Sequence, residues 1–490
     1  MKRILSVCSL LLLLNTYAEA QRMCGIEAEK AAMIAHDPTW AAKFAAQRDA
    51  LQGIADAYKQ SLASTAERST SVISPVPVIF HIMVTASQLA TIGGIAGVQQ
   101  RCDSQIVVLN RDYNRGNLDS GAIPDCWKPL FGYVGVQFGL AHTTPSGTGT
   151  PGYEILIIPD AVGGYSSYPA YAAAKSTASG GLDAWDNTKY LNVWCLNFND
   201  VSGLLGSTCP RSFVGGGGIT NAEMGVCINY EALGKRASPA DSYIATGWGA
   251  DYYDLGRTLT HEIGHFFEIW HTWGDDDGKC PWDPTGNDDG LADTPPEDDH
   301  KYYAIPDAIT CGTVYDGCRY DTADHPAVDT QLATYGIADH DYMNYVDDIA
   351  MLMFTKDQAA AMAAMVLVPP TSGTGPTGSG TIGESYSLTQ HPILLTYPAN
   401  TLVNQADLNN TVDVAPNPTT GIINVTYNRN ISALLGISVT NILGQEVANT
   451  NTTGMAQDYY SIDLSGMSKG IYFVRCNFAS GSITRKILLQ

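Results

Sequence analysis

Residues 261–271 read HEIGHFFEIWH and place three histidines and a glutamate close together. His261 and His265 are four positions apart, which puts both imidazoles on one face of an α-helix beside Glu262. His271 cannot share that face if the helix continues, so the chain must turn before it. This spacing predicts a zinc ion held by His261, His265 and His271, with one coordination position left for water.

A single HExxH pattern is common, and an ordinary amphipathic helix with solvated histidines is the alternative interpretation. The chain has only 10 His in 490 residues, so three at ligand spacing favour the metal site. Zinc lowers the pKa of a bound water to about 7, and Glu262 is placed to accept the proton of that water as general base. The predicted reaction is hydrolysis of a peptide bond.

The composition predicts a multidomain globular protein that does not bind nucleic acid. A chain of 490 residues with 45% hydrophobic residues is too long for one compact core. Its 49 acidic and 27 basic residues give a formal net charge of −22, which repels phosphate backbones and anionic membrane surfaces.

The N-terminal region predicts export. Lys2 and Arg3 precede an apolar stretch at residues 4–14 and the pattern AEA at 18–20, which together indicate a signal peptide over residues 1–20. No later stretch approaches the roughly 20 apolar residues of a membrane span, so none is expected. Residues 21–74 show helical periodicity and are expected to form a separate helical leader.

A mixed α/β domain is expected over residues 75–368. Apolar and aromatic runs predict strands at residues 76–84, 134–140, 154–158 and 190–198. Apolar periodicity predicts helices at residues 98–110 and 254–267, the second carrying the histidines. A stretch of Pro, Gly, Ser and Thr then predicts a linker at residues 369–408, and alternating strands predict an all-β sandwich at residues 409–490.

The histidine motif and its surroundings resemble those of the pappalysin-type metzincins, a family of zinc metalloproteases. The likeness rests on HEIGHFFEIWH, on the flanking GRTLTHEIGH and HTWG, and on DYMNYVDD at residues 341–348, which is similar to the methionine turn of the family. The resemblance implies an α/β metzincin domain with a twisted mixed sheet, a backing helix and an active-site helix. It also implies that Met343 lies beneath the metal and that Tyr345 is a catalytic residue near it.

Glu268 departs from the family pattern, because the family has a glycine at this bend between the second and third histidines. A left-handed backbone costs a non-glycine residue about 1–2 kcal/mol, which apparent zinc-binding energies of about 10–16 kcal/mol exceed. We therefore expect a strained turn with a working site. The alternative is a surface adhesin or binding protein with a structural or degenerate metal site.

The resemblance further implies a latent zymogen. Cys24 lies in the segment RMCG at residues 22–25, and such a cysteine in the family occupies the open zinc position until the leader, residues 21–74, is removed. The alternative is an ordinary free or disulfide-bonded cysteine. Export permits disulfides, and one is expected among Cys280, Cys311 and Cys318.

The loop after His271 is a candidate calcium site, with a solvated acidic loop as the alternative. Its carboxylates are Asp275, Asp276, Asp277, Asp283, Asp288, Asp289 and Asp293. Family members are similar in having calcium near this loop. They also favour a basic residue after the scissile bond, for which Asp347 or Asp348 is the candidate pocket residue.

The C-terminal segments VAPNPTTGIINV, VTNILGQEV, IDLSGMSKGIYFV and ITRKILLQ resemble the sorting domains of the type IX secretion system of Bacteroidetes. The resemblance implies an address that secretion machinery reads, and a β-sandwich that binds carbohydrate or the cell surface is the alternative. The sequence thus predicts an extracellular zinc endopeptidase, secreted or attached to the cell surface, acting on protein or peptide substrates. A peptidase with a distant glutamate as third ligand fits less well, because His271 already takes that place.

Overall fold

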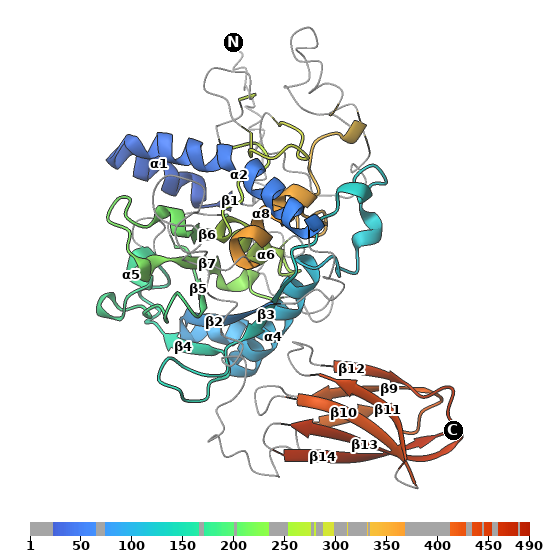
Figure 1. Cartoon of the computed structure of the whole chain (residues 1–490). Coiled ribbons are helices and arrows are strands. Elements are labelled where there is room, and N and C mark those ends of the chain that lie inside the picture. The colour runs from blue at the N-terminus through green and yellow to red at the C-terminus, as the bar shows by residue number, and fades with distance from the viewer. Residues whose placement is uncertain are drawn as a thin grey trace, which may run out of the picture.

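A mixed sheet of seven strands forms the middle of the N-terminal part of the chain (Figure 1). The computed structural model describes residues 23–64, 74–165, 171–199, 203–234, 253–275, 279–280, 288–297, 311, 331, 334–367, 412–427, 434–442, 445–452, 459–478 and 481–490. The predicted signal peptide, residues 1–20, and the predicted linker, residues 369–408, lie outside these ranges.

The order of the strands in this sheet is β1-β6-β7-β5-β2-β3, and β4 also pairs with β2. Their bounds are β1 Met23–Cys24, β2 Ser74–Val84, β3 Val136–Leu140, β4 Tyr153–Ile157, β5 Leu191–Leu196, β6 Leu204–Cys209 and β7 Gly225–Asn229. β6 runs antiparallel to β7, whereas the other described pairs are parallel. The predicted strands at 76–84, 134–140, 154–158 and 190–198 are confirmed, with shifts of a few residues at their ends.

Both faces of the sheet are covered, as the long central strand β2 shows. Side chains alternate between faces along a strand. Val78, Phe80 and Ile82 are fully buried in the core that also contains residues of the helices α4 and α6. The intervening Ile79 and Met83 are fully buried in separate clusters on the opposite face. Because both sets are apolar and buried, β2 reads as a nearly continuous hydrophobic run, which the buried His81 interrupts.

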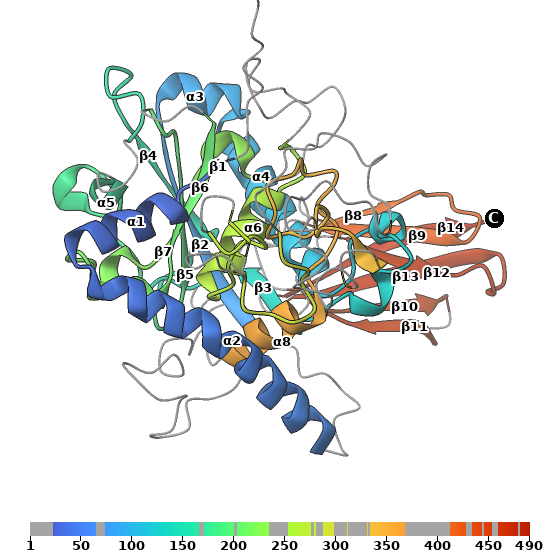
Figure 2. The ribbon, with the colours of Figure 1, turned by 90° about the horizontal axis from the view of Figure 1, so that it is seen from above.

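Two helices place the histidine motif against one face of the sheet. These are α4 (Gly94–Asp112) and α6 (Arg257–Phe266), which Figure 2 shows on one side of the strands. The ring of Tyr113, just after α4, lies 5.1 Å from Phe138 of β3 and 6.2 Å from Phe267. The predicted helices at 98–110 and 254–267 are therefore confirmed, the second beginning later than expected.

The remaining described helices are mostly short. They are α1 Ile26–His36, α2 Thr39–Ser64, α3 Ala86–Thr91, α5 Tyr171–Ala174 and α8 Lys356–Leu367, with 3-10 turns at η1 Ser120–Ala122, η2 Lys128–Leu130, η3 Thr177–Ser179, η4 Arg211–Phe213, η5 Asn221–Glu223 and η6 Tyr230–Ala232. Among the described helices, none combines the length and apolar character that crossing a membrane requires.

The N-terminal leader is helical over α1 and α2, as predicted, and it packs against the domain that follows it. α2 runs beside α8 in both views, and β1 joins the sheet through β6 (Figures 1 and 2). Met33, Phe44 and Leu51 are buried in the same core as Ile263 of α6. The apolar stripe of an amphipathic helix must be covered, and here the domain that follows the leader covers it.

The C-terminal region is an antiparallel β domain with its own core, which confirms the all-β prediction. Its strands are β8 Val412–Ala415, β9 Ile422–Tyr427, β10 Leu434–Asn441, β11 Glu446–Asn451, β12 Tyr459–Asp463, β13 Gly470–Phe478 and β14 Gly481–Leu489. They form a four-stranded sheet, β11-β10-β13-β14, and a three-stranded sheet, β12-β9-β8. Side chains of both sheets, including Val425, Val439 and Val474, share one hydrophobic cluster.

The disulfide expected among Cys280, Cys311 and Cys318 does not include Cys311, and a bridge between the other two stays a prediction. Cys311 pairs with Cys126 across a sequence separation of 185, with Cα atoms 5.9 Å apart. Cys280 is also disulfide-bonded, and Cys318 lies outside the described residues. Spacing along the chain could not reveal a partner that only tertiary folding brings near.

Candidate active site

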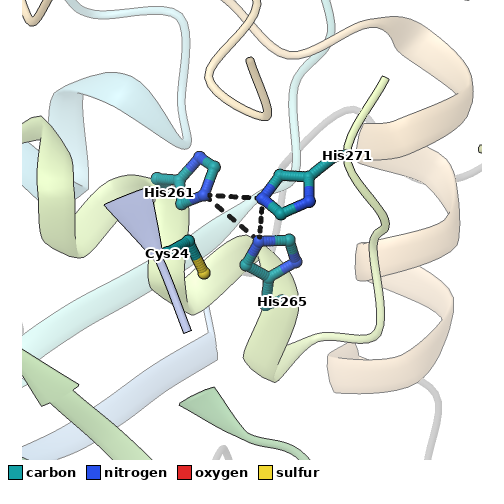
Figure 3. Close-up of side chains that lie close together, drawn as sticks. All are labelled: Cys24, His261, His265 and His271. Atoms are coloured by element: carbon teal, nitrogen blue, oxygen red, sulfur yellow. Dashed lines mark hydrogen bonds between the residues drawn. The ribbon is translucent and has the colours of Figure 1, made fainter. Parts of the chain in front are cut away.

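The three predicted zinc ligands converge in space (Figure 3). The Nε2 atom of His265 lies 3.1 Å from that of His261 and 3.0 Å from that of His271, and the third separation is 3.3 Å. All three side chains are fully buried. The Sγ of Cys24 belongs to the same group, in which all ligand atoms lie within 4.8 Å of one another.

The outer nitrogens of the rings fix which way the inner nitrogens face. Nδ1 of His261 donates to the carbonyl of Tyr342 at 2.7 Å, and Nδ1 of His265 donates to the carbonyl of Ile269 at 2.7 Å. Because a carbonyl only accepts, the proton is on Nδ1 and the Nε2 lone pair points inward. Nδ1 of His271 is hydrogen-bonded to the carboxylate of Asp275.

Three inward lone pairs at these separations repel one another unless a cation lies between them. Zinc–nitrogen bonds of about 2.0–2.1 Å in a tetrahedral site place the nitrogens roughly 3.3 Å apart. The observed spacings of 3.0–3.3 Å match that geometry. The donor set therefore fits a zinc ion held by neutral imidazoles.

The chain turns sharply between the second and third histidines, as the spacing requires. The amide of Glu268 donates to the carbonyl of His265 at 2.8 Å, and the amide of Ile269 donates to that of Gly264 at 3.0 Å. Glu268 has a φ of 71°, so the glycine position of the family has kept its left-handed backbone. This strain is the reason that an adhesin with a degenerate site was an alternative.

Hydrogen bonds hold Glu268 in this strained turn. Its buried carboxylate accepts from the amide and hydroxyl of Ser212 at 3.1 and 2.7 Å, and from the side chain of Gln47 in α2. Burial raises the pKa of Glu268, while the Ser212 and Gln47 donors oppose that shift. Since the histidines still converge, the strain has not displaced the predicted ligands.

Glu262 lies between the histidines and strand β6. Its Oε2 accepts a hydrogen bond from the Thr208 hydroxyl at 2.6 Å, and its side chain is buried. A Cβ atom on Gly206 of β6 would overlap the Glu262 carboxylate, so glycine makes room for it. The carboxylate is thus fixed close to the point at which the histidines meet.

The methionine turn lies beneath α6. Met343 is fully buried, and its sulfur faces Gly264, where any side chain larger than glycine would overlap it. The Tyr345 ring lies 4.7 Å from the His271 ring and 5.9 Å from the His261 ring. The Trp273 ring stacks on His271, with centroids 4.3 Å apart and planes 6° apart.

Cys24 reaches the histidines from strand β1. That strand pairs in parallel with β6, and the following amide of Gly25 donates to the Gly206 carbonyl at 2.8 Å. Burial and the charge of Glu262 raise the pKa of the Cys24 thiol well above its ordinary value. A divalent cation at the histidines would lower the pKa of the same thiol.

Some neighbours of the site were missed at the sequence level. Asp275 contacts His271, Thr208 holds Glu262, and Trp273 covers the third imidazole. Asp275 was noted only as a calcium candidate, although its position four residues after His271 was a signal. The local sequence carries no comparable signal for Thr208, because the fold alone brings β6 to α6.

Calcium binding stays a prediction. Asp276, Asp277 and Asp283 lie outside the described residues. Among the described residues, the two groups that could hold a metal are Cys24 with the three histidines, and Glu27 with His271 and Asp275. In the predicted pocket for a basic substrate residue, Asp348 accepts from the amides of Leu255 and Arg257 at 2.9 and 3.2 Å.

Comparisons with known proteins agree with this geometry. Residues 178–367 match the Peptidase_M43 family model, described as pregnancy-associated plasma protein-A, and residues 413–490 match a secretion system C-terminal sorting domain. Extracellular metalloprotease 1 of Coccidioides posadasii is 26% identical over 310 residues, covering 62% of this chain and 91% of that protein. An extracellular metalloprotease of Colletotrichum graminicola is 33% identical over 151 residues, but the match spans only 45% of its length.

Two solved structures from Tannerella forsythia are similar in fold. A mutant of promirolysin superposes with a TM-score of 0.54 at 24% identity, covering 76% of this chain and 98% of that one. Mature mirolysin in complex with a cleaved peptide gives a TM-score of 0.51 at 26% identity, covering 67% of this chain and 100% of that one.

The fold and the histidine site are those of a metalloprotease domain. More specifically, residues 178–367 resemble the pappalysin-like peptidases and residues 413–490 resemble secretion sorting domains, which together with the extracellular relatives indicates a secreted metalloprotease.

Proposed function

We propose that this protein is a zinc-dependent endopeptidase made as a latent zymogen. His261, His265 and His271 hold the metal, and Glu262 is the general base. The observation that carries this proposal is the convergence of three Nε2 atoms at 3.0–3.3 Å, with outer nitrogens bound to acceptors. Such an arrangement supports binding of a divalent cation more than packing of an ordinary core.

When bound, zinc acts as a Lewis acid and lowers the pKa of a water molecule. Glu262 would accept a proton from the attacking water and pass it to the leaving amine. Thr208 keeps the Glu262 carboxylate in place through the 2.6 Å hydrogen bond. Tyr345 is proposed to donate to the substrate once its hydroxyl is released from Cys24, and Met343 supports the histidines from below.

Latency in this proposal comes from residues 21–74. Cys24 lies close enough to the three histidines that it would hold the metal with them through its thiolate, and β1 covers the β6 edge. An exposed strand edge can pair with an extended peptide, so β6 is the natural docking edge for a substrate. Removal of the leader frees both the metal position and the edge. We further propose that the sorting domain, residues 409–490, is read by secretion machinery, and that residues 369–408 link it to the enzyme.

Substitution of the proposed general base tests this function. In the processed protein, Glu262→Gln should keep its zinc while cleavage of a denatured protein falls by at least about 100-fold, because general base catalysis is lost. Glu446→Gln, the same change in the C-terminal domain, is the control and should leave the rate unchanged. Full activity of Glu262→Gln with normal zinc content would refute the assignment.

A further inference from the structure

Lys30 of α1 is inserted into a pocket of the peptidase domain. Its side chain is largely buried, its Nζ lies 2.6 Å from Oδ2 of Asp275, and the same nitrogen lies 3.2 Å from the centre of the Trp270 ring. Lys30 belongs to the leader, whose removal is part of the proposed function. The groups that receive its charge remain on the mature enzyme.

The pocket lies next to the metal centre. A small cavity there is lined by Lys30 and Gln47 of the leader and by Ser212, His265, Glu268 and Trp270 of the peptidase domain. Because the proposed zinc ligand His265 lines this cavity, a substrate side chain that enters the cavity would come from a peptide bound at the active site. The cavity follows the end of β6, which is the edge that β1 occupies in the precursor.

Loss of the leader removes one partner from each acidic group of this pocket. Glu268 loses the Gln47 donor but keeps those of Ser212, and Asp275 loses the Lys30 ammonium but keeps His271. Both carboxylates are nearly inaccessible in the precursor, with side-chain exposure of only 2% for Asp275. Burying a carboxylate is costly unless its charge is paired or hydrogen-bonded. An apolar substrate side chain would bury both carboxylates again without the lost partners, whereas a cation would replace the charge of Lys30.

We infer that Glu268, Trp270 and Asp275 form a subsite for a lysine or arginine side chain of the substrate, and that Lys30 fills this subsite in the precursor. The inference rests on the proposed function, because it requires a peptide in the cleft. A long cationic side chain would pair with Asp275 and lie on the indole face, as Lys30 does, and its charge would favour the nearby Glu268 carboxylate. The subsite is separate from Asp348, whose carboxylate accepts from Leu255 and Arg257.

Glu268 gives this subsite a feature that the family glycine cannot supply. Its carboxylate is placed in the pocket by a backbone with a φ of 71°, a conformation that glycine adopts without strain. The variant Glu268→Gly should therefore fold, and it removes one acidic group without touching the histidines. Trp270→Leu is a second variant, which removes the aromatic face while keeping apolar bulk.

Binding of matched peptides tests the subsite without any turnover. The probes are fluorescent peptides of residues 22–36, both with Cys24→Ser, one keeping Lys30 and the other carrying norleucine there. The target is the processed, zinc-loaded protein with Glu262→Gln. We expect the Lys30 peptide to bind about tenfold more tightly, and this ratio to fall below about threefold in Glu268→Gly and in Trp270→Leu. Equal affinities of the two peptides for the unaltered pocket would overturn the inference.

Cleavage of a peptide library by the processed enzyme gives an independent readout. We expect Lys and Arg to be enriched at a position that does not adjoin the scissile bond, and this enrichment to fall several-fold in Glu268→Gly. Cleavage without any such enrichment, or with the same enrichment in the variant, would overturn the subsite. Absence of all cleavage would instead contradict the proposed function, and the peptide-binding ratio would still decide on the subsite.

Discussion

The Tyr345 hydroxyl contacts both main-chain polar groups of Cys24. It accepts from the Cys24 amide at 3.1 Å and donates to the Cys24 carbonyl at 3.3 Å, across 321 positions of sequence. A residue of the methionine turn thus holds the leader by its backbone, while the thiol of the same leader residue faces the histidines. In the proposed zymogen, these two kinds of contact at one residue would keep the precursor closed.

Replacing the Cys24 thiol should open the site only in part. Cys24→Ala removes the sulfur but leaves the backbone contacts with Tyr345 and β6. We therefore expect the unprocessed variant to cleave peptides at a clearly higher initial rate than the unprocessed natural chain. This rate should stay below that of the processed enzyme. The measurement is hydrolysis of a quenched peptide, with gels confirming that the leader is still attached. Cys476→Ala, the same change in the C-terminal core, should stay latent; equal rates for both variants would speak against a cysteine-held precursor.

Apolar packing should hold the leader more strongly than its surface ion pair. Phe44 is 3% exposed, and its ring lies 5.4 Å from that of Phe213. Truncation of such a buried ring costs about 3–5 kcal/mol, so Phe44→Ala should weaken retention of a nicked leader by at least about 100-fold.

Lys59→Met is the matched control for the leader. The Lys59–Asp357 ion pair is 2.5 Å long, but the Lys59 side chain is 41% exposed, and such pairs contribute about 1 kcal/mol or less. Size-exclusion chromatography after a cut near residue 70 would show whether the leader stays bound. A stronger effect from Lys59→Met than from Phe44→Ala would reverse this ranking.

Asp341 should make stability depend on pH. Burial raises the pKa of its carboxyl to about 8, although the Met343 amide and Gln358 donate to it at 2.7 and 3.1 Å. The unfolded value is about 3.9, so the folded state holds the proton more tightly and the free energy of unfolding falls as pH rises between about 4 and 8. Asp341→Asn cannot titrate and should lose this part of the slope, becoming more stable than the natural chain at pH 8. Urea unfolding of both proteins at several pH values measures how the free energy of unfolding depends on pH. The same pH dependence in both proteins would exclude a contribution from Asp341.

The local part of the site was predictable from the sequence. His261 and His265 needed only the helical repeat, and the bend before His271 followed from its distance along the chain. The methionine turn came from its likeness to a family motif. The positive φ expected at Glu268 is present as well, at 71°.

Contacts between distant segments could not be predicted in the same way. β6 has the sequence LLGSTC, and such a short run with Gly, Ser and Cys gives little indication of a strand. This strand nevertheless places Thr208 within hydrogen-bonding distance of Glu262. The Cys126–Cys311 bond and the insertion of Lys30 beside Trp270 depend on tertiary packing. The packing of the leader is a third such contact, because helical periodicity does not say what covers an apolar face.

The zinc content of the processed protein tests the three-histidine centre most directly. We expect one zinc ion per chain by elemental analysis, with loss of both metal and peptide cleavage on chelation and recovery of both when Zn²⁺ is returned. His271→Ala should fail to retain zinc under the same conditions, because two imidazoles remain. A folded, processed enzyme that contained no stoichiometric metal and cleaved peptides at an unchanged rate in chelator would contradict the proposed centre.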